Sequence, residues 1–258
     1  MGKNKLAKFA RMREIPFVFQ YPYSVLAEHG FDMRGNWHSR FFGNDNPIVV
    51  ELGCGKGEYT VGLARRFPDR NFIGIDIKGA RMYSGASQAE AEGLKNVAFV
   101  RTSIELLPHF FSPGEVSELW ITFADPQMKK QRKRLTSTRF MQLYRQVLTP
   151  GGRINLKTDS PFLYTYTRNL CLANPAAMHV LCDTADLYAA PDTAGTPLDI
   201  RTHYEQQWLS RGFTIKYLAY TLDADTPLNE VDDDLIPRDE YKSYSRDKAS
   251  QIQNPKQQ

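Results

Sequence analysis

The chain of 258 residues is long enough for one large domain with a sizeable core, and its 41% hydrophobic and 24% charged residues are ordinary for a globular protein. No apolar run approaches the ~18 residues that a membrane helix needs, which argues against a membrane partner. Three cysteines (Cys54, Cys171 and Cys182) without C-x-x-C spacing argue against a disulfide framework or a zinc site. We therefore expect a cytoplasmic protein that holds no metal.

The two ends of the chain carry opposite charges, although the formal net charge is only +4. Residues 1–13 hold five cations and no acid, whereas residues 223–240 hold eight acids and a single cation, Arg238. The N-terminus is too polar for a signal peptide and too poor in serine for a transit peptide, and Leu6 replaces the hydroxyl residue of a myristoylation site. We expect residues 1–46 to form a basic extension and residues 223–258 an acidic and polar one, partly disordered.

Between these extensions, short apolar runs alternate with segments of helical period. The runs at residues 48–50, 72–75, 97–100, 119–123 and 153–157 predict strands. Helices are predicted at residues 79–92, 137–148, 161–173 and 203–211, and a last strand at residues 214–222. Residues 180–182 fit a short strand and residues 185–199 a loop. This alternation implies a mostly parallel sheet with right-handed crossovers in one domain, residues 47–222.

A glycine-rich loop follows the first of these strands. Gly53, Gly55 and Gly57 allow a tight turn and a close approach of a ligand to the backbone. Glu51 precedes the loop, and Asp76 ends the next strand at the spacing of an acid that binds paired ribose hydroxyls. Because a carboxylate beside the loop repels a pyrophosphate and suits the ammonium group of S-adenosylmethionine (SAM), the electrostatics favour SAM over NAD. The alternative is that Glu51 only caps a nearby turn.

The fourth predicted strand ends in Ala124-Asp125-Pro126 and leads into a cluster of cations. Open α/β sheets bind their ligands at the carboxyl ends of the strands, and cations there can neutralise phosphates and set the register of a nucleic acid. We expect this basic cluster to contact a polyanion through Lys129, Lys130, Arg132, Lys133 and Arg134. The alternatives are a solvated charged face for the cluster and a turn cap for Asp125.

Asp159 ends the fifth predicted strand, at the same edge of the sheet as Asp125. Two acids at neighbouring strand ends can hold one base between them. Because Pro161 begins a predicted helix, Asp159 is equally well placed to be the N-cap of that helix. The sequence leaves both interpretations open.

Five stretches of the chain together resemble the bacterial tRNA (guanine-N7)-methyltransferase family. They are VVELGCGKGEYTVGLARRFPDRNFIGID, EGLKNVAFVR, ITFADPQMKKQRKRL, LTPGGRINLKTD and, more loosely, IRTHYEQQWLSRG, and they span residues 48–212. The first stretch is common to many SAM enzymes, whereas Asp-Pro-x-x-Lys-Lys-x-x-Lys-Arg and the late Thr-x-x-Glu are more specific. The resemblance implies an α/β fold of the class I SAM-dependent methyltransferases (Rossmann-like): a mostly parallel seven-stranded sheet with an antiparallel C-terminal strand and helices on both faces.

The resemblance also implies roles for the matching residues. Glu51 and Asp76 match SAM contacts, and Thr102 stands where the family has an acid or amide beside the adenine, so that this contact weakens or moves to Ser103. Asp125, beside the transferred methyl group, matches the catalytic acid and belongs to the cofactor site as well. Substrate contacts of the family match Lys129, Asp159 and the segment Thr202, His203, Tyr204 and Glu205.

The implied reaction transfers the SAM methyl group to N7 of a guanine in the variable loop of tRNA and leaves S-adenosylhomocysteine. Guanine N7 has a free lone pair at neutral pH, so its alkylation needs orientation in line with the sulfonium rather than a base. We therefore expect Asp125 to accept hydrogen bonds from the guanine N1–H and amino group and to stabilise charge. His203 is expected to be a solvated substitute for a family lysine, and the enzyme a monomer or homodimer.

The chain departs from the family on both sides of Asp125. Ala124 and Gln127 stand where the family has Pro and Trp, which puts a stacking contact and the stiffness of the loop in question. Other functions therefore stay open: a SAM methyltransferase for another RNA base, a protein or a small molecule, and a non-catalytic RNA-binding relative. A dehydrogenase is the weakest alternative. The sequence suggests no function for the acidic segment after Leu222.

Overall fold

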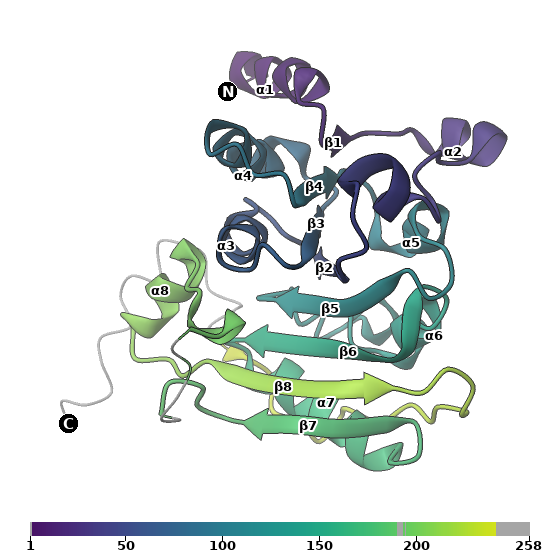
Figure 1. The fold of residues 1–258 in the computed structure, drawn as a ribbon. Coiled ribbons are helices and arrows are strands. Elements are labelled where there is room, and N and C mark those ends of the chain that lie inside the picture. The colour runs from purple at the N-terminus through teal and green to yellow at the C-terminus, as the bar shows by residue number, and fades with distance from the viewer. Residues whose placement is uncertain (1, 190–192, 194, 241–258) are drawn as a thin grey trace.

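Eight strands form one sheet in the computed structural model, which describes residues 2–189, 193 and 195–240 (Figure 1). The strands are β1 (Val18–Phe19), β2 (Ile48–Leu52), β3 (Asn71–Ile75), β4 (Val97–Val100), β5 (Val116–Thr122), β6 (Leu148–Thr158), β7 (Met178–Thr184) and β8 (Lys216–Leu222). Their order is β1-β4-β3-β2-β5-β6-β8-β7, and only β8 runs antiparallel to its neighbours, β6 and β7. The predicted fold is confirmed, with one strand more than expected because β1 joins the edge beside β4.

Helices cover both faces of this sheet (Figure 1). One face carries α1 (Gly2–Glu14), α3 (Glu58–Arg66), α4 (Gly79–Ala91) and α8 (His203–Leu209). The other face carries α2 (Tyr23–His29), the π-helical turn η1 (Trp37–Phe42), α5 (Leu107–Phe110), α6 (Thr138–Tyr144) and α7 (Pro161–Ala173). Three short 3₁₀ turns are η2 (Ile104–Leu106), η3 (Gln131–Lys133) and η4 (Pro197–Asp199). Every residue of β2 and β3 is buried, as expected for central parallel strands covered on both sides.

None of the helices in the described part of the chain has the length and apolar character needed to cross a membrane.

One helix boundary differs from the prediction. The helix expected at residues 137–148 ends at Tyr144, and Leu148 already belongs to β6, where it pairs with Val116 of β5. The register between β5 and β6 shifts just after this pair, and Gly151 has a φ of 70°. The Pro-Gly-Gly sequence therefore bends the start of a strand instead of only ending a helix, because pairing with β5 buries Leu148.

The residues expected as a basic extension are integrated into the domain. Met12 of α1 and Ile15, just after this helix, are buried on one face of the sheet, and Leu26, Phe31 and Trp37 on the other. The indole Nε1 of Trp37 donates a hydrogen bond of 2.9 Å to the carbonyl of Phe110. Many of these contacts come from aromatic residues after position 16, such as Phe31 and Trp37, which the charge pattern of residues 1–13 does not reveal.

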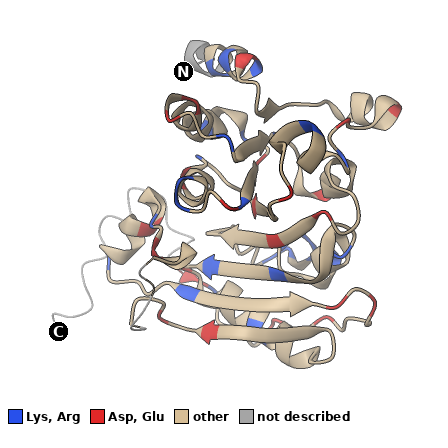
Figure 2. Ribbon diagram, viewed as in Figure 1, with Lys and Arg blue, Asp and Glu red and all other residues tan. Residues whose placement is uncertain are grey.

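The first part of the acidic segment also packs against the domain. Figure 2 shows acidic residues on the loop that follows β8. Glu230 accepts hydrogen bonds from the backbone N–H of Thr138 (3.1 Å) and the hydroxyl of Tyr166 (2.6 Å). Asp239 accepts one of 3.0 Å from the N–H of Phe162, in the first turn of α7. Residues 241–258, to which the prediction of a disordered tail also applies, lie outside the described residues.

We expect Trp37→Ala to lower the free energy of unfolding by about 3–5 kcal/mol, because it empties a fully buried aromatic site. Chemical denaturation measures this change. The control is Tyr23→Ala, at a side chain that is 60% exposed, with an expected change within about 0.5 kcal/mol. Equal effects of the two variants would mean that residues 1–46 do not belong to the cooperative unit.

Candidate functional site

The order of the strands creates a switch point between β2 and β5. From β2 the chain winds outward to β3 and β4, and β5 then lies on the opposite side of β2. Ligands of open α/β sheets bind at the carboxyl ends of the strands next to such a point. The glycine loop, residues 53–57, follows β2, and the Asp125 loop, residues 123–128, follows β5, so the two halves of the predicted site meet there.

The glycine loop needs its glycines for two different reasons. Gly53, Gly55 and Gly57 all have positive φ angles, of 77°, 56° and 74°. A Cβ atom on Gly57 would lie 2.8 Å from the ring of Phe99, so this glycine permits tight packing of α3 on the sheet. A Cβ atom on Gly53 would meet nothing within 4 Å, and one on Gly55 only the Gly53 carbonyl at 4.0 Å. These two positions leave open space where a ligand can approach the backbone.

Glu51 lies beneath this loop and connects three elements. Its carboxylate accepts hydrogen bonds from the N–H of Thr60 in α3 (2.9 Å), from the Thr60 hydroxyl, and from the hydroxyl of Thr122 at the end of β5 (2.5 Å). Burial raises the pKa of the Glu51 carboxyl, and the bonds from both threonines oppose that shift. Glu51 thus caps the first turn of α3, which is the role that the sequence left open as the alternative.

The next two strands bring the other predicted cofactor residues to the same edge. Asp76, after β3, accepts hydrogen bonds from the N–H of Gly55 (2.9 Å) and of Lys78 (2.6 Å), and so holds the glycine loop in place. After β4, Thr102 is buried, and the hydroxyl of Ser103 bonds to Glu105. Their assignment to the cofactor stays a prediction.

The Asp125 loop is strained on both sides of its acid. Phe123 and Gln127 have φ angles of 51° and 47°, a left-handed conformation that residues other than glycine rarely adopt. Such strain is typical of functional sites. The Asp125 side chain is exposed and accepts a hydrogen bond of 2.9 Å from the N–H of Gln127, so it does cap the turn. It also lines an open hollow of about 520 Å³ with Gln127, Met128, Lys129, Lys130 and Arg238.

The basic cluster divides into exposed and buried members. Lys129, Lys130, Arg132 and Lys133 are exposed, as expected of phosphate contacts. Arg134 is fully buried, and its guanidinium donates to the carbonyl of Pro126 (3.0 Å) and pairs with Asp233 (2.6 Å). The buried position of Arg134 is not that of a phosphate contact: this arginine holds the Asp125 loop against the acidic segment.

The late motif Thr202–Glu205 forms the beginning of α8. Thr202 is the N-cap and Glu205 completes a capping box, so both ends of the motif have structural roles. His203 and Tyr204 are exposed. The backbone N–H of His203 donates to Glu58 at the start of α3 (2.6 Å), and the Tyr204 ring lies 5.5 Å from that of Phe123. α8 therefore joins the glycine loop to the Asp125 loop.

A buried ion pair fixes the segment before α8. Lys157, on β6, and Glu205 are both without exposed side-chain surface, and Nζ lies 2.9 Å from Oε1. The same Nζ donates to the carbonyls of Leu198 (3.1 Å) and Ile200 (2.9 Å). Burial lowers the pKa of Lys157, and the nearby Glu205 opposes that shift. Lys157, like Glu58, is absent from the predicted site residues, because only the tertiary structure reveals its partners.

Asp159 lies at the end of β6, next to the end of β5 that carries Asp125. It is buried, and its carbonyl accepts a hydrogen bond of 3.2 Å from Nζ of Lys216. The N-cap of α7 is Ser160, whose hydroxyl accepts from the N–H of Leu163 at 3.0 Å, so the alternative of Asp159 as this cap is wrong. Its contact with a base stays a prediction.

We expect Glu205→Gln to lower the free energy of unfolding by about 3–5 kcal/mol, because Lys157 is then buried without a counter-charge. Thermal and denaturant unfolding measure the loss. Adding Lys157→Met removes the unpaired charge, so the double variant should regain part of the stability. A control, Thr202→Ala, removes only the cap and should cost about 1 kcal/mol. A double variant less stable than Glu205→Gln alone would contradict this role of the pair.

Comparison with solved structures supports the fold. The 16S rRNA methyltransferase KamB matches with a TM-score of 0.55 at 16% identity, over 73% of this chain and 92% of its own. A 16S rRNA (adenine(1408)-N(1))-methyltransferase from Catenulisporales acidiphilia matches with a TM-score of 0.52 at 15% identity, over 78% and 96%. At these identities the likeness concerns the fold alone.

Sequence comparisons identify the family. A family model described as "Putative methyltransferase" matches residues 45–218. A Bacteroides thetaiotaomicron protein named tRNA (guanine-N(7)-)-methyltransferase is 56% identical over 99% of this chain and 100% of its own length. A Porphyromonas gingivalis protein of the same name is 58% identical over 93% of this chain and 98% of its own. The chain therefore belongs to the tRNA (guanine-N(7)-)-methyltransferase family.

Proposed function

We propose that this protein transfers the methyl group of SAM to N7 of a guanine in tRNA, with the variable loop as the target. The observation that carries the proposal is the meeting of the glycine loop and the strained Asp125 loop at the switch point, in a chain of this family. Action in the cytoplasm, without a metal, as a monomer or homodimer completes the proposal.

The residues at the strand ends fit SAM. The open backbone at Gly53 and Gly55 gives it room, and the Asp76 carboxylate suits the paired hydroxyls of its ribose. Glu51 supplies negative charge beneath the loop for the ammonium group, and Thr102 or Ser103 lies where the adenine is expected. When bound, SAM supplies a methyl group activated by the sulfonium.

Asp125 holds the guanine in this proposal. Its exposed carboxylate lies at the end of β5, between two residues of left-handed backbone. Because guanine N7 already has a free lone pair, the enzyme needs to orient the base rather than remove a proton. A carboxylate that accepts from N1–H and the amino group does so and stabilises the charge that develops on the ring. Asp159, just after the neighbouring strand β6, is the second proposed contact; because its side chain is fully buried, the residues that cover it would have to move for it to meet the base.

The exposed cations of the basic cluster bind the tRNA backbone in this proposal. Lys129, Lys130, Arg132 and Lys133 follow the Asp125 loop directly, so phosphates that they contact set the position of the base. His203 and Tyr204, exposed at the start of α8, border the same region through Phe123. The proposal gives supporting roles to three further residues. Arg134 holds the Asp125 loop through the carbonyl of Pro126, and Thr202 and Glu205 cap the helix that begins with His203 and Tyr204.

The proposal is tested by incubating the protein with methyl-labelled SAM and total tRNA and identifying the modified nucleoside by mass spectrometry. We expect 7-methylguanosine from the wild type and no transfer by Asp125→Ala, whose SAM affinity should stay within a few-fold. The control Asp69→Ala removes an exposed acid before β3 and should keep full activity. Another methylated nucleoside would overturn the function, and loss of SAM binding by Asp125→Ala would overturn the role of that residue.

A second prediction concerns the basic cluster. Replacing Lys130, Arg132 and Lys133 with Gln should raise the tRNA dissociation constant at least tenfold and lower its salt slope by roughly 2–3, since each phosphate contact contributes about one. Binding at several salt concentrations measures both quantities. Arg134→Gln should instead lower the melting temperature, because it leaves Asp233 without its buried partner. An unchanged salt slope in the triple variant would show that the cluster is only a solvated face.

A further inference from the structure

The acidic segment, residues 223–240, places a cation beside Asp125. Arg238 lines the same hollow of about 520 Å³ as Asp125, Lys129 and Lys130, and its side chain is 42% exposed. Three cations therefore face this hollow against one carboxylate. An excess of positive charge around an open hollow attracts an anion rather than a neutral molecule.

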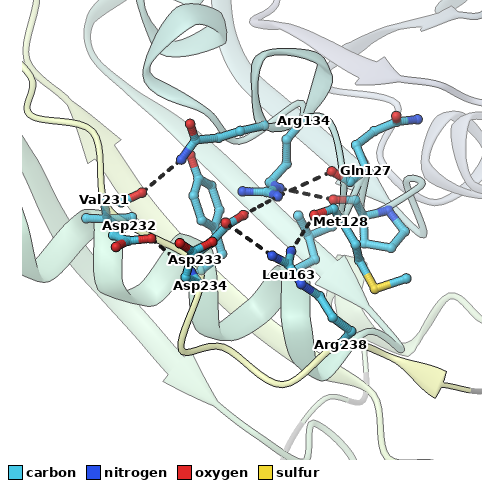
Figure 3. A network of polar contacts seen from close by, with 12 residues as sticks. Gln127, Met128, Arg134, Leu163, Val231, Asp232, Asp233, Asp234 and Arg238 are labelled. Atoms are coloured by element: carbon cyan, nitrogen blue, oxygen red, sulfur yellow. Dashed lines mark hydrogen bonds and ion pairs between the residues drawn. The ribbon is translucent and has the colours of Figure 1, made fainter.

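Contacts with the loop hold Arg238 at this place (Figure 3). Nη1 donates to the carbonyl of Met128, in the Asp125 loop, and Nη2 lies 3.5 Å from Oδ1 of Asp233. The guanidinium carbon lies 4.7 Å from the centre of the Phe162 ring. The side chain is thus oriented before any ligand binds, which lowers the entropy lost on binding.

Asp233 does not neutralise Arg238. Its other oxygen, Oδ2, is 2.6 Å from Nη2 of Arg134, so one carboxylate serves two guanidinium groups. Arg134 is completely buried and cannot meet a ligand, whereas Arg238 has exposed surface in the hollow. The charge left over from this three-residue network is therefore available at Arg238.

The rest of the segment fixes the position of this network. Ile236 is buried against Phe162 and Tyr166 of α7. The Asp239 carboxylate accepts from the N–H of Phe162 at 3.0 Å, and its own N–H lies 3.1 Å from the sulfur of Met128. Arg238 stands between these two anchored residues, so its backbone has a defined place next to the loop.

We propose that Arg238 is a further substrate-binding residue, which contacts a backbone phosphate of the tRNA next to the nucleotide held by Asp125. This inference rests on the proposed function. A guanidinium can bind two phosphate oxygens at once, which makes arginine better suited than lysine to fixing the direction of a strand. In this proposal the acidic segment, anchored by Ile236 and Asp239, holds Arg238 beside the site.

The test compares Arg238→Gln, Arg238→Lys and Lys95→Gln in the full-length protein. Lys95 is an exposed cation just before β4, at the amino end of that strand and therefore away from the hollow at the carboxyl ends. Its replacement with Gln changes the net charge by the same amount. We expect Arg238→Gln to weaken tRNA binding about tenfold and to lower the salt slope by about one, with SAM affinity within twofold of wild type. Lys95→Gln should keep both the tRNA affinity and the salt slope of the wild type. Arg238→Lys should keep the salt slope and lose part of the affinity.

Two results would overturn the inference. If Arg238→Gln keeps the wild-type salt slope while its melting temperature and kcat fall, Arg238 only supports the loop. If Lys95→Gln weakens binding as much as Arg238→Gln, the effect comes from net charge alone. The proposed function fails separately, when the wild type yields a nucleoside other than 7-methylguanosine, because the salt slope is measured by binding and does not depend on the product.

Discussion

The candidate site depends on one buried carboxylate. Glu51 lies in β2 at the switch point and accepts hydrogen bonds from α3 on one side and from the end of β5 on the other. A buried acid is tolerated only when its oxygens accept hydrogen bonds. The first turn of α3, which follows the glycine loop, and the end of β5 therefore have to stay within hydrogen-bonding distance of Glu51. Burial disfavours the charged form of Glu51 and so raises its pKa, and the hydrogen bonds from Thr60 and Thr122 oppose this shift. This junction holds the start of α3 next to the end of β5.

The same principle applies along the carboxyl edge of the sheet. Lys157 and Glu205 form a buried pair that holds the segment before α8. The buried Arg134 and the partly exposed Asp233 form a pair that holds the Asp125 loop. Lys157 lies on the central strand β6 and Arg134 just after η3, and each is paired with an acid from a later segment of the chain. Removing one partner of such a pair costs more than the pair contributes. These pairs therefore specify where the loops lie more than they increase stability.

Features set by local sequence could be predicted, and features set by distant contacts could not. The strands, the glycine loop and the acid after β5 follow from apolar periodicity and turn residues near one another in the chain. Arg134 and Asp233 are 99 residues apart, and Glu58 and His203 are 145 apart, so no local pattern shows that they meet. For this reason Arg134 resembled its exposed neighbours, and Glu205 resembled a substrate contact although it is a buried cap. The aromatic residues after position 16 were the local sign that the N-terminal residues join the core.

The opposite charges of the basic cluster and the acidic segment raise a question about RNA binding, because acids near a tRNA site would repel its phosphates. The geometry answers it for the acids nearest the hollow. Asp239 is buried against the first turn of α7, and Asp233 is only 13% exposed and lies between two guanidinium groups. These two carboxylates interact with groups of the protein itself: Asp239 with the N–H of Phe162, and Asp233 with two guanidinium groups. The exposed cations of the cluster and Arg238, by contrast, keep exposed surface. An acidic segment can thus support a basic site without neutralising it, provided that the acids nearest the site are paired within the protein and its one arginine keeps exposed surface.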